Sequence, residues 1–189
     1  MSSETIISIF LGVGLAASVG FRVFLPLFAL GVAAYTGLWD LNPSWEWIGS
    51  LPAVIAFGVA TILEIFGYFI PWFDHLLDSL AIPLAILAGT MVMASTVTDM
   101  DPLMTWGLAI IAGGGTATAI KGASATGRLA STFSTAGFGN PLVSTIETGM
   151  ATLVSLVSLL LPMVGVLLVI VILIFIFTIY WRLRPRIKN

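Results

Sequence analysis

Cysteine is absent from this 189-residue chain, and charged residues make up only 8% of it. Without cysteine, disulfide bonds and cysteine-ligated zinc or iron–sulfur centres are excluded. Soluble domains carry about a quarter of their residues as charged side chains, so a soluble domain is excluded as well. The formal net charge of -2 offers no basic surface for nucleic acid. No phosphate-binding loop, HExxH pair or Ser-His-Asp pattern is visible, so no cofactor is expected.

Long apolar runs fill the chain, and 59% of its residues are hydrophobic. A membrane-spanning helix needs roughly 20 residues, so we expect about six to seven spans in an all-α, polytopic transmembrane helix bundle. Little sequence remains for a second domain, so residues 1–189 should form a single transmembrane domain. A break is needed near Pro162, because one helix over 142–181 would be about twice as long as the bilayer core is thick. The expected spans are 5–21, 23–38, 49–70, 81–98, 103–120, 142–160 and 164–181.

The distribution of cations predicts the orientation of these spans. Cations favour the cytoplasmic side of a membrane, and the tail RLRPRIK (182–188) therefore places the C-terminus in the cytoplasm. Counting back through seven spans puts the N-terminus outside and places Arg22, Lys121 and Arg128 on the inner side. The first ten residues lack the positive region of a secretory signal peptide, so the first span is expected to stay in the membrane.

Residues 113–141 read GGGTATAIKGASATGRLASTFSTAGFGNP, and nearly all of them are small. From Gly122 onwards the segment has too many Gly, Ser and Thr residues for a helix that faces lipid. We expect a broken or re-entrant segment near 122–141, because irregular backbone at membrane depth is tolerated where it lines a cavity. Asn140 then precedes Pro141, which suits the start of the next helix. An ordinary cytoplasmic loop packed over the bundle is the alternative.

Two glutamates lie inside predicted spans, Glu64 and Glu147. A charge at this depth costs several kcal/mol unless it is paired, hydrated or protonated. Small or hydroxylated residues share their helical faces, so both glutamates should face the interior of the bundle. They are either structural, each neutralised by a nearby base, or part of a proton or cation pathway. The full set of candidate pathway residues is Glu64, Glu147, Arg22, Lys121, Arg128, Ser144, Thr148 and Asn140.

The stretch PWFDHLLDSL, residues 71–80, is typical of an amphipathic helix at the inner membrane interface. At helical spacing, Asp74, His75 and Asp78 share its polar face. The alternative interpretation is an interfacial acid or metal cluster, because this pattern brings two carboxylates to the only histidine. Which metal such a cluster would bind is unknown.

Several segments resemble a known family. These segments read GLAASVGFRVFLPLF, SLPAVIAFGVATILEIFGYFIPWFDHLLDSLAIP, LAIIAGGGTA and GFGNPLVSTIETG. They are similar to segments of small bacterial inner-membrane proteins of the domain of unknown function 4126 family. The resemblance covers most of residues 10–162 and implies a multi-pass protein of the bacterial inner membrane, with no established activity. A weak internal repeat is also possible, because GLAASVGFR and TILEIFG are echoed by GGGTATAIK and STIETG.

These observations favour a small transporter or channel in the lipid bilayer that moves a small ion or polar solute and uses its intramembrane carboxylates for coupling or coordination. Seven spans are few for a self-contained transporter, so a homo-oligomer is expected. The first alternative is a membrane-embedded, metal-dependent enzyme acting on lipid through Asp74, His75 and Asp78. The second is a non-catalytic scaffold or assembly factor whose buried charges specify packing.

Overall fold

The computed structural model describes residues 2–183, except for the side chains of Pro71, Trp72, His75, Tyr180 and Leu183. Within this part every regular element is a helix, which confirms the predicted all-α polytopic bundle. The elements are α1 (Ser3–Phe21), α2 (Phe24–Tyr35), η1 (Pro43–Gly49), α3 (Leu51–Gly67), α4 (Pro71–Thr96), α5 (Pro102–Leu108), η2 (Ala109–Gly114), α6 (Gly115–Thr135), α7 (Asn140–Leu160) and α8 (Pro162–Leu183).

Five helical stretches are long and apolar enough to cross a membrane, and they establish a multi-pass membrane protein. A sixth span is formed if η1 and α3, which meet at a bend of 62°, are counted together. Helix α2 is apolar but has only 12 residues. The five stretches are 3–21, 76–96, 102–135, 140–160 and 162–179.

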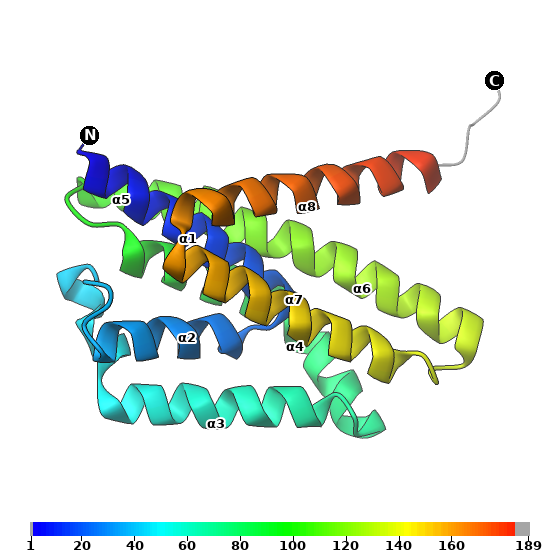
Figure 1. Ribbon diagram of the computed structural model, residues 1–189. Helices are drawn as coiled ribbons and strands as arrows, with labels where there is room; N and C mark the ends of the chain where they lie inside the picture. The colour runs from blue at the N-terminus through cyan, green and yellow to red at the C-terminus, as the bar shows by residue number, and fades with distance from the viewer. Residues whose placement is uncertain (1, 184–189) are drawn as a thin grey trace.

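The helices run back and forth along one common direction (Figure 1). One end of the bundle contains the start of α1, the α2–α3 connection and the α4–α5 connection. The α3–α4 connection, the α6–α7 turn and the end of α8 lie at the other. This arrangement agrees with the predicted grouping of the loops. Most of the cationic tail, residues 184–189, lies outside the described residues, so the side on which the C-terminus lies stays a prediction.

Proline explains two of the breaks between helices. Pro26 would clash with the carbonyl of Arg22, four residues earlier, if α1 continued through it. The chain accordingly leaves the helix at Arg22, whose φ of -136° and ψ of 125° are extended. Pro162 begins α8 after Leu161 leaves the helical conformation. The predicted break near Pro162 is confirmed.

Two expected local structures need correction. The stretch 71–80 is the first part of the long helix α4, and so it is not a separate interfacial helix. Residues 115–135 form the continuous helix α6, so the expectation of irregular backbone from Gly122 onwards fails. The interruption is confined to the turn at 136–139, where Ala136 and Gly137 have positive φ.

The hydroxyl groups of α6 show why a small-residue segment stays helical. Four of them donate to the backbone carbonyl four residues earlier: those of Thr118, Thr126, Ser134 and Thr135. A chain in lipid must form hydrogen bonds to its polar groups internally. In a helix, both the backbone N–H groups and the side-chain hydroxyls can donate to backbone carbonyls of the preceding turn. The surroundings therefore outweigh the weak helix propensity of Gly, Ser and Thr.

Glycines bring α4 and η2 into backbone contact. A Cβ built on Gly113 would lie 2.5 Å from the carbonyl oxygen of Gly89, and one on Gly89 would lie 2.8 Å from that of Gly113. Only residues without side chains permit this approach, which is typical of helix pairs in membranes. The crossing fixes α6, which follows η2, against the rest of the bundle.

Candidate functional site

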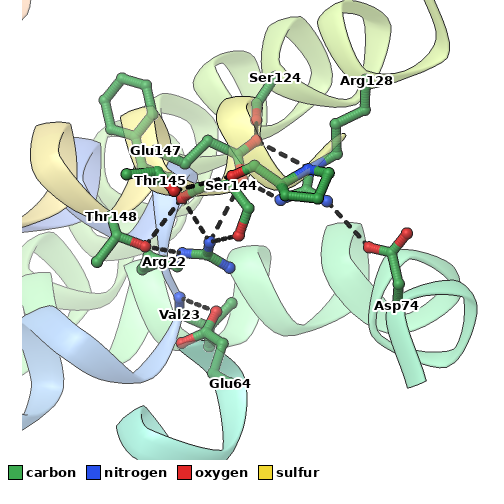
Figure 2. A network of polar contacts seen from close by, with 12 residues as sticks. Arg22, Val23, Glu64, Asp74, Ser124, Arg128, Ser144, Thr145, Glu147 and Thr148 are labelled. Atoms are coloured by element: carbon green, nitrogen blue, oxygen red, sulfur yellow. Dashed lines mark hydrogen bonds and ion pairs between the residues drawn. The ribbon is translucent and has the colours of Figure 1, made fainter. Parts of the chain in front are cut away.

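Six buried ionisable side chains lie at the break between α1 and α2. We call them the charge cluster: Arg22, Glu64, Asp74, Lys121, Arg128 and Glu147. None is more than 7% exposed. They come from the α1–α2 break and from helices α3, α4, α6 and α7 (Figure 2). Three cations and three carboxylates give the cluster a formal charge of zero.

The Arg128–Glu147 pair is the centre of the cluster. Two nitrogens of the Arg128 guanidinium bind the two carboxylate oxygens of Glu147, with Nε 3.0 Å from Oε1. The third, Nη1, donates to Oδ1 of Asp74 at 3.0 Å. Ser124 also donates its hydroxyl to Glu147. Arg128 thereby links α6 to both α7 and α4 through charge-assisted hydrogen bonds.

Arg22 joins the end of α1 to α7. Its Nε donates to the Thr148 hydroxyl at 3.0 Å, and its Nη2 donates to the backbone carbonyl of Ser144 at 2.8 Å. Nη2 also lies 3.8 Å from the carboxylate of Glu147. The remaining nitrogen, Nη1, is buried without a hydrogen-bond partner among the described residues.

Tyr68, directly after α3, lies between the two arginines. The central guanidinium carbons of Arg22 and Arg128 are 4.2 Å and 4.0 Å from the centre of its ring. The ring is buried between these two cations. The negative face of an aromatic ring attracts cations most strongly where water is excluded.

We expect Tyr68→Leu to destabilise the protein relative to Tyr68→Phe by about 2 kcal/mol, because only leucine removes the two cation–π contacts. Thermal unfolding of both variants in detergent would measure the difference. Tyr68→Phe is the matched control, since it keeps the ring and removes only the hydroxyl. Equal stability of the two variants would show that the stacking contributes little.

Glu64 and Lys121 satisfy the backbone at the α1–α2 break. The carboxylate of Glu64 accepts hydrogen bonds from the N–H groups of Val23 at 2.8 Å and Phe24 at 3.0 Å. The ammonium of Lys121 donates to the carbonyl of Phe21 at 3.1 Å. Each charge therefore has the sign that the adjacent helix dipole favours: negative at the start of α2 and positive at the end of α1.

The structure brings together seven of the eight predicted pathway residues. Asn140 is the exception, because it forms hydrogen bonds with Thr132 at the α6–α7 turn instead. The sequence interpretation missed Ser124 and Tyr68. Helical spacing could have found both: Ser124 lies four residues before Arg128 on α6, and Tyr68 lies four residues after Glu64.

The predicted interfacial acid cluster is divided in the structure. Asp74 is bound to Arg128, whereas Asp78 is exposed. The side chain of His75 lies outside the described residues. Among the side chains that are described, no group of three potential ligands is placed to hold a metal ion.

An apolar groove separates α3 from α7 beside the cluster. It has a volume of about 700 Å³. Thr148, whose hydroxyl binds Arg22, is part of its wall, so a single side chain separates the groove from the buried guanidinium. The lining residues are Ile65, Phe66, Phe69, Thr145, Thr148, Gly149, Thr152, Leu153 and Leu156.

Comparison with protein families matches residues 9–182 to a family described as a domain of unknown function, DUF4126. The match spans the charge cluster and the helices that carry it. No curated protein and no solved structure is significantly similar to the chain.

Proposed function

The chain belongs to the DUF4126 family, and we infer its role from the charge cluster that lies within the matched residues. We propose that it is a small membrane transporter or channel for a small ion or polar solute. Burial of six ionisable groups at a helix break is the observation that supports this proposal. Charges inside a membrane protein are costly and mark ion or substrate pathways.

The pairing within the cluster suggests how a transported species would act. Arg128 holds α4, α6 and α7 together only while Glu147 and Asp74 keep their charges. A solute or proton that binds one member of the cluster leaves its former partner uncompensated. Buried charges without partners are strongly unfavourable, so the helices would rearrange. The cluster would then serve as a gate.

Flux into liposomes that contain only this protein is the direct test. With protons, Na⁺, K⁺, chloride and phosphate as probes, we expect transport of at least one. We expect Glu147→Gln to reduce that transport at least about tenfold, which corresponds to about 1.4 kcal/mol, because the change removes the carboxylate charge that pairs with Arg128. Glu4→Gln, the same change at an exposed position on α1, is the matched control and should leave flux unchanged.

Silence of the wild-type protein across all these probes would contradict the proposal. It would favour the second candidate, a scaffold or assembly factor of the membrane. The observation behind that candidate is that both oxygens of Glu147 already have hydrogen-bond donors. Stable co-purification with one partner protein, together with absent flux, would support it.

We infer that the protein resides in the bacterial inner membrane with its C-terminus in the cytoplasm, on the basis of the cationic tail. We also propose that copies associate. The number of spans supports association, because five or six helices are few for a self-contained transporter.

A further inference from the structure

The carboxylate of Glu64 is held differently from that of Glu147. Its two oxygens accept from the N–H groups of Val23 and Phe24, at the start of α2. Among the described residues no cation lies within ion-pair distance of it, although it is only 4% exposed. A buried carboxylate here is therefore held by backbone N–H groups and the positive end of a helix dipole. This is the arrangement with which proteins bind free anions.

Arg22 supplies a second, independent sign of an anion site. Its Nε and Nη2 form one edge of the guanidinium, and this edge faces Thr148 and Ser144 of α7. Nη1 lies at the opposite end, is buried and has no partner among the described residues, in a residue that is 0% exposed. Figure 2 shows the guanidinium between α7 and the carboxylate of Glu64. A buried charged donor without an acceptor is costly.

Helix α3, which carries Glu64, is held mainly by one neighbour. It packs principally on α2, and the groove of about 700 Å³ separates it from α7. Its buried residues are few: Ala53, Thr61, Glu64 and Gly67. A helix with so few buried contacts belongs to the less stable part of a fold, so withdrawal of Glu64 from the start of α2 breaks few other contacts.

We propose that a binding site for a small monovalent anion lies between the N-terminus of α2 and Nη1 of Arg22, and that the carboxylate of Glu64, as a tethered substitute, fills the α2 side of this site without pairing with Nη1. The inference rests on the proposed function, because it names the class of solute that the cluster would admit. The free anion and the charged Glu64 exclude each other. Binding therefore requires that Glu64 is neutralised or withdraws.

The charged surroundings of Glu64 suit this exchange. Arg22 at the α1–α2 break and Lys121 on α6 both interact electrostatically with the Glu64 carboxylate. Tyr68 directly follows α3, the helix that carries Glu64. The carboxylate of Glu147 lies 3.8 Å from Nη2 of Arg22. Two cations and one further carboxylate leave a net positive environment when Glu64 loses its charge. An incoming anion restores the balance.

The test measures anion binding to purified protein in detergent, with gluconate as the bulky background anion. The variants are Glu64→Ala and Glu64→Ser, and the probes are sodium chloride and sodium formate in isothermal titration. Near neutral pH we expect saturable binding in the variants, at least about tenfold tighter than in the wild type. Formate should also raise the unfolding temperature of Glu64→Ala, because a ligand of the native state stabilises it. Neutral formamide should not.

Glu4→Ala is the matched control, because it removes an exposed carboxylate and should create no anion binding. If Glu64→Ala does not fold, Glu64→Ser decides, since its short polar side chain also leaves the position of the carboxyl group free. Absence of chloride and formate binding in the folded variants would overturn the inference. Anion binding without flux would support the anion site and contradict the proposed transport function. Flux without anion binding would support the transport function and contradict the anion site.

Discussion

Arg128→Met is expected to lower the free energy of unfolding by about 3–5 kcal/mol, because it leaves Glu147 and Asp74 as buried carboxylates without their main partner. Methionine keeps much of the apolar volume of the side chain, so the loss arises from charge and hydrogen bonding. Reversible unfolding in mixed detergent micelles, followed by circular dichroism, measures it. Arg182→Met, at an exposed arginine near the end of α8, should leave stability unchanged.

A double-mutant cycle separates this explanation from a loss of packing. Glu147→Gln removes one of the two stranded charges, so the combination with Arg128→Met should cost less than the sum of the single changes. For groups in direct contact the expected coupling is about 1–3 kcal/mol. Additive effects would show that the ion pair contributes nothing specific, and that Arg128 acts through its bulk.

Gly113→Leu is expected to prevent normal assembly of the bundle. A Cβ at this position would lie 2.5 Å from the carbonyl oxygen of Gly89 and 2.6 Å from the Cβ of Met93. Backbone cannot move aside as a flexible side chain can, so α4 and η2 must separate. The cost should reach or exceed the upper end of the roughly 1–3 kcal/mol usual for overpacking.

Gly115→Leu is the matched control, because it makes the same change two residues later in the same glycine run. Apart from its chain neighbours and the adjacent backbone of its own helix, no atom lies within 4 Å of a Cβ built on Gly115. This variant should be as stable as the wild type or slightly more so, since leucine favours helix over glycine by roughly 0.8 kcal/mol. Comparison of folded yield and thermal unfolding for the two variants tests the crossing. Equal behaviour would contradict it.

The sequence was sufficient for most of the helices and for the face of α7 that turns inward. Apolar runs of bilayer length predicted the five stretches that are long enough to span a membrane, although the expected span over 23–38 contains only the 12-residue α2. The spacing of Ser144, Ala151, Ser155 and Ser158 around Glu147 predicted a buried face that the structure confirms. These successes share a cause, since both patterns repeat within one helix. Short-range periodicity is visible without knowledge of any partner.

The sequence did not reveal which groups meet. Asp74 was assigned to an interfacial cluster, whereas Arg128, 54 positions away, is its partner. The helicity of residues 122–135 was missed because glycine, serine and threonine favour loops in water, whereas a chain inside a bundle has no water to satisfy its backbone. Both errors concern the environment of a residue, which a single sequence does not display.

The position of Arg22 has a consequence for synthesis of the protein. Its hydrogen-bond partner Ser144 lies 122 positions further along the chain. At about 5–20 residues per second, a ribosome needs roughly 6–24 s to make the intervening segment. For that time the first helical hairpin carries a cation that has not yet met α7. We expect the hairpin to stay at the insertion machinery or near the lipid headgroups until α7 arrives, so that the order of translation sets the order of assembly.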